Sequence, residues 1–104
     1  MAANHRILLS KPAAADLEGI FDYIARHSPQ NASKMVARIL DSIARLEQFP
    51  HRTVVENALG DLNHPVRSLP VPPYIVFFRV LDEQRIVRVL RVRHGAQGRP
   101  DRYD

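Results

Sequence analysis

The stretch Tyr74–Gly95, YIVFFRVLDEQRIVRVLRVRHG, decides the fold. It contains two runs rich in β-branched and aromatic residues, Tyr74–Leu81 and Ile86–Arg93, separated by the polar residues Asp82-Glu83-Gln84-Arg85. This pattern predicts an antiparallel β-hairpin. The polar break contains neither Gly nor Asn, so we expect a four-residue connection built on a type I turn rather than a type I′ turn.

Both faces of this hairpin are expected to be apolar. If Leu81 pairs with Ile86, alternation along the strands places on one face Val76, Phe78, Val80, Val87 and Val89. The other face receives Ile75, Phe77, Leu81, Ile86, Leu90 and Val92, with Arg79 opposite Arg88. A one-residue slip would only exchange the faces. Because each apolar face must be covered, we expect helices on one face and a partner protein on the other.

The N-terminal half is expected to supply those helices. Arg6–Leu9 is consistent with a buried strand, and Ser10 is a suitable N-cap for a helix with apolar residues at positions 13, 17, 20, 21 and 24. A second amphipathic helix extends from Ala32 to Phe49 and ends at Pro50. Two antiparallel helices joined by a few residues form a helical hairpin.

The remaining segments complete a β-α-α-β-β-β order. Residues 50–63 are expected to form a loop, with a helical turn at Val54–Leu59, and Val66–Leu69 is expected to form a strand at a sheet edge because prolines surround it. The fold class is therefore α+β, with a helical hairpin on one face of a small, mostly antiparallel sheet. We expect a single domain over residues 1–104, in which residues 95–104 form a flexible tail.

Composition excludes several classes of protein. The 104 residues include no Cys, which removes disulfides, thiolate zinc sites and cysteine nucleophiles. No apolar run has the length of a signal peptide or membrane span, so a cytoplasmic protein is expected. The net charge is +4, and the excess lies in residues 67–104, which carry eight Arg against four acidic residues. This half is suited either to nucleic acid or an acidic protein partner, or simply to solvation.

Few residues are candidates for a catalytic or ligand-binding role. Nucleotide-binding, metalloprotease and hydrolase motifs are absent, and the five histidines lack ligand spacing, so neither a metal site nor a cofactor is expected. The candidates for phosphodiester cleavage are Arg67, Arg79, Arg91 and His94. The alternatives are a His94 bonded to backbone and arginines paired with Asp82 or Glu83.

Five blocks of sequence resemble the ParE branch of the RelE/ParE toxin superfamily. They are Ser10–Ala25, Leu46–Pro50, Val66–Val71, Tyr74–Val80 and Ile86–Ala96. The resemblance implies that the chain is the toxin of a type II toxin–antitoxin module, also called a plasmid stabilisation module. Such a toxin would inhibit DNA gyrase. The resemblance also implies a ParD-like antitoxin that forms a hetero-oligomer with the toxin and covers the hairpin at Ile75, Phe77, Arg79, Ile86, Arg88, Leu90 and Val92.

The superfamily leaves the target open. ParE-type toxicity involves the C-terminal strand and tail, which implies target-binding residues Arg91, Arg93, His94 and Tyr103. RelE-type members instead cleave mRNA in the ribosome with Lys and Arg residues on the sheet. Here Ile75 occupies a position where RelE-type nucleases tend to have Arg, and the preceding strand has Arg67 but no Lys. An mRNA endonuclease is therefore the alternative, and a chain that only binds a partner without being toxic is a third hypothesis.

Overall fold

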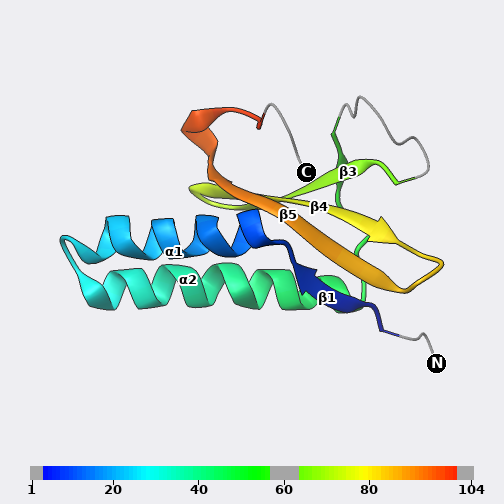
Figure 1. The fold of residues 1–104 in the computed structure, drawn as a ribbon, viewed down its shortest axis with the longest axis horizontal. Helices are drawn as coiled ribbons and strands as arrows, with labels where there is room; N and C mark the ends of the chain where they lie inside the picture. Colours follow the sequence, from blue (N-terminus) through cyan, green and yellow to red (C-terminus); the bar gives the residue numbers. More distant parts are fainter. Residues whose placement is uncertain (1–3, 57–63, 101–104) are drawn as a thin grey trace.

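Two helices lie against one face of a five-stranded sheet (Figure 1). The computed structural model describes residues 4–56 and 64–100. In chain order the elements are β1 (Arg6–Leu9), α1 (Lys11–Ala25), α2 (Pro29–Ala44), a 3-10 turn η1 (Arg45–Glu47), β2 (Val54–Val55), β3 (Val66–Val71), β4 (Tyr74–Leu81), β5 (Ile86–His94) and a 3-10 turn η2 (Gly95–Gln97). The strand order is β1-β5-β4-β3-β2. Only the β1–β5 pair is parallel among the described strands, which confirms the expected α+β fold.

Serine caps determine where both helices begin. The Ser10 side chain accepts a hydrogen bond from the Ala13 N–H at 3.1 Å, which confirms the predicted N-cap of α1. Ser28 accepts one from the Asn31 N–H at 3.1 Å at the start of α2. The Ser10 hydroxyl also donates to the Leu90 carbonyl of β5 at 2.9 Å. Ser10 thus both caps α1 and connects it to the sheet.

Replacement of Ser10 by Ala is expected to lower the free energy of unfolding by about 1–2 kcal/mol, because the cap and the bond to Leu90 are lost together. Ser28→Ala, which removes only a cap, is the matched control and is expected to cost about 1 kcal/mol. Urea unfolding of both variants measures the difference. Equal losses would show that the bond to β5 contributes nothing.

A β-bulge changes the register of the central hairpin. Leu81 pairs with Ile86 and Arg79 with Arg88, which is the first of the two registers considered from the sequence, across a four-residue turn. Between Phe77 and Phe78 the register shifts, so that Phe78 pairs with Val89 but Phe77 pairs with Arg91. Val92 therefore pairs with Val76 and joins the core under the helices. The prediction that Val92 shares a face with Phe77 is wrong, because the extra residue in β5 reverses the alternation beyond it.

The helices cover the expected apolar face of the hairpin. Leu17, Ile20, Ile39 and Ile43 of the helices pack into one cluster with the helix-facing strand residues. These strand residues are Val71, Tyr74, Val76, Phe78, Val80, Val87, Val89 and Val92. This cluster is the main core of the protein.

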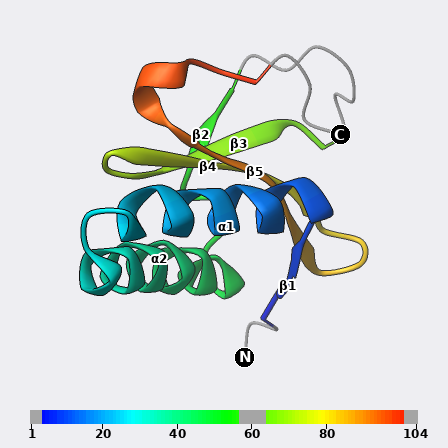
Figure 2. The same ribbon diagram turned by 60° about the vertical axis from the view of Figure 1, so that its left-hand side comes forward.

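The opposite face of the sheet forms a second, smaller core. Val66, Phe77 and Leu90 are 1%, 0% and 1% exposed, and Ile75 packs against them. We call these four residues the outer core. Figures 1 and 2 show that the turn η2, which follows β5, lies on this side of the sheet, away from the helices. The expectation that this face is open to a partner is therefore wrong for Phe77 and Leu90, whose side chains are buried within the chain itself.

The segment that follows β5 contacts the rest of the protein. Arg99 forms an ion pair with Glu56, whose other carboxylate oxygen accepts a hydrogen bond from Ser68 at 2.8 Å. Pro100 is buried. Residues 95–100 of the expected tail thus include the turn η2 and a contact with the β2 region, whereas residues 101–104 lie outside the described residues.

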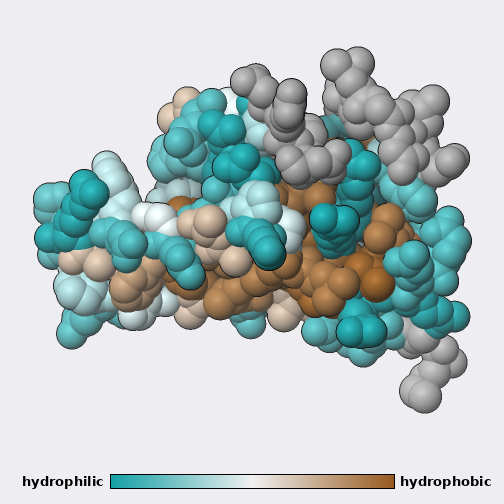
Figure 3. All heavy atoms as spheres, viewed as in Figure 1, coloured by the Kyte–Doolittle hydropathy of each residue, from teal (hydrophilic) through white to brown (hydrophobic). Residues whose placement is uncertain are grey.

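Large apolar side chains are exposed away from the hairpin. Leu8 and Leu9 of β1 are 42% and 41% exposed, because β1 is an edge strand rather than the buried strand that was expected. On the helices Phe21 and Leu40 are also exposed. Figure 3 shows hydrophobic residues gathered in a band along the helices and around β1. This side of the molecule therefore offers apolar surface to a partner, and Val54 and Val55 of β2, 63% and 50% exposed, offer more at the other edge of the sheet.

The segment between the helices and β3 differs from its prediction. Val54–Val55 forms the short strand β2, not part of a helical turn, and pairs with Ser68 and Arg67 of β3. Residues 57–59 of the predicted turn lie outside the described residues. β3 therefore lies at the edge of the sheet only along the residues that do not pair with β2. No helix in the described part of the chain is long and apolar enough to cross a membrane.

Candidate functional site

A groove of about 600 Å³ separates the middle of α1 from the end of β5. Helix α1 contributes Asp16, Gly19 and Tyr23, among others, and the sheet contributes Tyr74, Val92 and His94. Gly19 places no side chain in the groove. Aromatic, acidic and imidazole groups thus face a common space next to the segment that the sequence predicted to bind a target.

Asp16, which lines this groove, forms an ion pair with Arg91. The Arg91 Nε and Nη2 atoms donate to the two oxygens of Asp16 at 2.8 and 2.9 Å, and the Val92 backbone N–H donates to the same carboxylate at 2.9 Å. The hydrogen bonds that Arg91 donates to the Asp16 carboxylate raise the pKa of Arg91. The guanidinium of Arg91 is therefore already used to hold α1 against β5.

His94 lies at the end of β5, with its ring against Tyr74. The ring centroids are 5.4 Å apart in an edge-to-face arrangement. The His94 Nδ1 accepts a hydrogen bond from the Ala96 N–H at 3.0 Å, so the neutral ring carries its proton on Nε2. Burial and the neighbouring Tyr23 raise the pKa of Tyr74. The Tyr74 hydroxyl and the Nε2 of the neutral His94 ring are thus both available as hydrogen-bond donors.

The other predicted arginines lie elsewhere. Arg67 donates to the His51 and Thr53 carbonyls at 3.3 and 3.0 Å and so holds the loop before β2. Arg67 pairs with Phe78 of the helix-facing core and therefore lies on that face of the sheet. Arg79 pairs with Arg88 on the outer face. The four candidates for cleavage are therefore not brought together: Arg67 and Arg79 lie on opposite faces of the sheet.

The remaining predicted site residues lie on the outer face or beyond the described chain. Arg93 pairs with Ile75, and both side chains are half-buried. The Nε atom of Arg79 is buried and has no hydrogen-bond partner among the described residues. Ile86 is half-buried and Arg88 is exposed. Tyr103 lies outside the described residues.

The two carboxylates of the β4–β5 turn, Asp82 and Glu83, are hydrogen-bonded to histidines. Asp82 is hydrogen-bonded to His51 and His5, and the bond from His51 contributes most to lowering the pKa of Asp82. A backbone hydrogen bond and then His64, at 3.1 Å, lower the pKa of Glu83. The alternative expected for the arginines, pairing with these two acids, does not occur in the described residues, because histidines take that role.

Known proteins resemble the chain over most of its length. Residues 7–98 match the sequence profile of the family described as the ParE toxin of the type II toxin–antitoxin system parDE. Toxin RelE2 of Caulobacter vibrioides is 35% identical over 86 residues, which cover 82% of this chain and 89% of that protein.

Solved structures share the fold. The chromosomal ParDE toxin–antitoxin system from P. aeruginosa contains a chain with a TM-score of 0.71 and 25% identity, covering 89% of this chain and 98% of that one. A chain of the toxin–antitoxin complex RelBE2 from Mycobacterium tuberculosis has a TM-score of 0.61 and 22% identity, covering 88% of this chain and 98% of that one. The second similarity concerns the fold alone.

Proposed function

The chain belongs to the ParE toxin family of type II toxin–antitoxin systems and is the toxin of such a module, and from this premise we propose that it inhibits DNA gyrase and is neutralised by a ParD-like antitoxin. Gyrase acts on DNA in the cytoplasm, which is where we place the toxin. Inhibition of this kind is a binding function and requires no catalytic group of the toxin's own.

This proposal rests on one observation: the four residues that are candidates for phosphodiester cleavage do not lie together in the fold. Cleavage of a phosphodiester needs an acid, a base and charge-stabilising groups around a single phosphate. Here Arg91 is paired with Asp16, Arg67 donates to loop carbonyls, and Arg79 lies on the opposite face from Arg67. Such an arrangement favours a protein that acts by binding.

We place the gyrase-binding surface at the end of β5. His94 and Gln97 of the turn η2 line the groove there, and Arg91 and Arg93 lie on the same strand, with Arg93 on the outer face of the sheet. Arg93 has no ion-pair partner among the described residues, so its charge is available to a target. Tyr103 remains a proposed contributor from the C-terminal end.

An acidic antitoxin fits two other features. Arg79 and Arg88 lie directly opposite each other, and the buried Nε of Arg79 lacks a partner in the described part of the chain, so a carboxylate there would offset both charges. Ile75 and Ile86 are the accessible apolar residues of the predicted set, since Phe77, Leu90 and Val92 are buried. The exposed apolar band over β1 and the helices offers a second contact area for the same antitoxin.

A ribosome-dependent mRNA endonuclease is the second candidate. The relative at 35% identity bears the name RelE2, which favours it. In this case Arg67, Arg79, Arg91 and His94 would have to act from positions that the free chain keeps apart, and binding to the ribosome would need to rearrange them.

Two assays in parallel test the proposal. Purified toxin is expected to inhibit supercoiling by gyrase while leaving translation in a cell-free extract unchanged, and Arg93→Glu is expected to reduce the inhibition at least tenfold. Arg79→Glu with Arg88→Glu is the matched control: inhibition persists, but an acidic ParD-like antitoxin no longer reverses it. Inhibition of translation with cleaved mRNA would support the second candidate instead. Expression that leaves growth unaffected would support the non-toxic hypothesis.

A further inference from the structure

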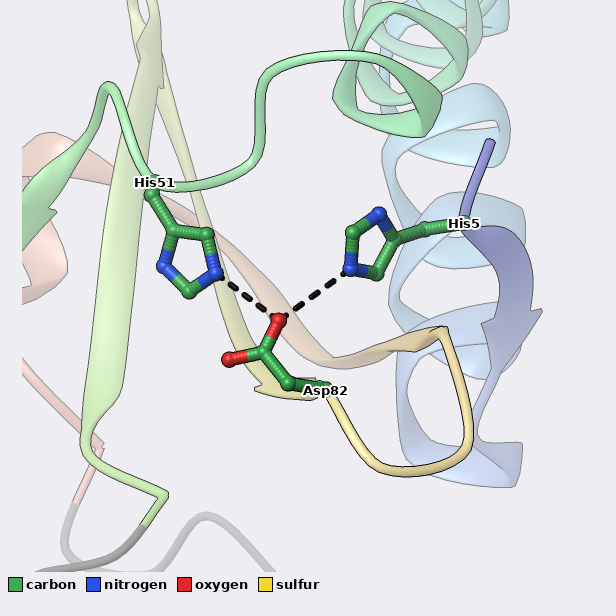
Figure 4. Close-up of side chains that lie close together, drawn as sticks. All are labelled: His5, His51 and Asp82. Atoms are coloured by element: carbon green, nitrogen blue, oxygen red, sulfur yellow. Dashed lines mark hydrogen bonds and ion pairs between the residues drawn. The ribbon is translucent and has the colours of Figure 1, made fainter. Parts of the chain in front are cut away.

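Three side chains from distant parts of the sequence meet beside the β4–β5 turn (Figure 4). His5 precedes β1, His51 lies between η1 and β2, and Asp82 begins the turn. The Nε2 atoms of His5 and His51 lie 3.3 and 2.9 Å from Oδ1 of Asp82. All three atoms lie within 4.8 Å of one another. The fold therefore gathers two imidazoles and one carboxylate at a single point.

Both rings point the same nitrogen at the same oxygen. A carboxylate that only accepted hydrogen bonds could use a different oxygen for each ring, yet Oδ2 of Asp82 has no partner among the described residues. In a tetrahedral zinc site with bonds of about 2.0–2.1 Å, neighbouring ligand atoms are roughly 3.3 Å apart. The two nitrogen–oxygen distances are close to that value. A cation could therefore join the three atoms after small side-chain movements.

We propose that His5, His51 and Asp82 bind one divalent transition-metal ion of the zinc class, with solvent completing its coordination. Two imidazoles and one carboxylate suit this class, whereas Mg²⁺ and Ca²⁺ prefer sites made of oxygen alone. The His51 and Asp82 side chains are 51% and 59% exposed and give the ion access from solvent. The His5 side chain, 15% exposed, forms the floor of the site.

The bound ion clamps three segments together. The His5 backbone N–H donates to the Glu47 carbonyl at 2.8 Å, and the His51 carbonyl accepts a bond from Arg67, so both ligands stand on anchored backbone. However, Nδ1 of His5 is buried without a partner in the described residues, whereas a metal-bound His normally donates through its second nitrogen. We therefore expect reversible binding, weaker than that of structural zinc sites, which ties the N-terminus and the loop before β2 to the hairpin turn.

Calorimetric titration of ZnCl₂ into untagged, full-length protein that has been dialysed against EDTA tests this site. The expected result is one ion per chain. At a free Zn²⁺ concentration of about 100 times Kd, the Tm is expected to rise by roughly 10–20 °C, because only the folded state assembles the three ligands. Absence of stoichiometric binding would overturn the proposal.

Three variants assign the binding to these residues. His51→Gln and Asp82→Asn change exposed side chains, and each is expected to weaken Zn²⁺ binding at least 10–100-fold. His27→Gln is the matched control and is expected to bind as the unmodified protein does. His27 lies in the α1–α2 connection, which Figure 1 shows at the opposite end of the molecule from the β4–β5 turn. Circular dichroism verifies that each variant is folded, and equal affinity in all three would refute the assignment.

Discussion

Replacement of Phe77 by Ala is expected to lower the free energy of unfolding by about 3–5 kcal/mol, a large part of the stability of a domain of this size. The side chain is 0% exposed and is the largest member of the outer core, where Val66 and Leu90 contact it. Truncation removes its buried apolar area and leaves a cavity that the hydrogen-bonded strands around it cannot easily close. Urea unfolding monitored by circular dichroism measures the loss.

Phe49→Ala is the matched control for this experiment. Phe49 is 54% exposed, so the same substitution there is expected to cost about 1 kcal/mol or less, including its contact with the Arg52 guanidinium. Similar losses for the two variants would mean that Phe77 is an exposed docking residue, as the sequence alone suggested, and not part of a core.

Replacement of Asp16 by Ala is expected to cost about 2–3 kcal/mol. The substitution removes two hydrogen bonds from Arg91 and one from the Val92 N–H, and it leaves a guanidinium without its carboxylate. The Arg91 and Asp16 side chains are 30% and 17% exposed, so water can replace part of the loss, and the cost falls below that of breaking a fully buried pair. Thermal and urea unfolding give the value.

An exposed pair provides the comparison for Asp16. Asp41 and Arg45 form an ion pair on the surface of α2 and its following turn, and Asp41→Ala is expected to cost no more than about 0.5 kcal/mol. Arg91→Lys distinguishes charge from geometry, because Lys keeps the charge but cannot bind both oxygens of Asp16 as Arg does. If Arg91→Lys were as stable as the original chain, the bidentate hydrogen bonding of Arg91 to Asp16 would contribute nothing to stability beyond the charge.

Sequence reasoning was most successful where local rules determine the structure. Ser10 caps α1 because its hydroxyl is the right length to reach the third helical N–H. The polar break at Asp82–Arg85 forms the turn because the apolar runs on both sides must pair. The match of Leu81 with Ile86 follows from that turn, and the helix-facing core up to Val89 follows from the match.

The bulge in β5 marks the limit of that reasoning. No turn residue or Gly signals the extra residue near Leu90, and a simple alternation therefore carries Val92 to the wrong face. The bulge also sets where Arg91 lies: opposite Phe77 and next to α1, within reach of Asp16. The same shift by one residue thus accounts for both the error in the core and the missed ion pair.

The contacts that escape prediction are those formed only by tertiary structure. Asp16 and Arg91 are 75 residues apart, and His5 and Asp82 are 77 apart. Spacing along the chain reveals ligands that share a helix or a turn, but it carries no information on residues that meet when β1 joins the sheet. The histidines are therefore scattered along the sequence, although the fold brings His5 and His51 to one carboxylate.

The parallel pairing of β1 with β5 has a consequence for synthesis. Ile7 pairs with Val87, which is synthesised about eighty residues later, so this edge of the sheet can form only after β5 has been synthesised. A nascent chain that emerges from the ribosome therefore has its helical hairpin early but lacks the surface that the hairpin must cover until translation is nearly complete. A gene truncated before β5 yields a polypeptide that has neither a docking place for its first strand nor the arginine-bearing end of its last one. We expect such a fragment not to be toxic, so that only the finished polypeptide would have to be restrained.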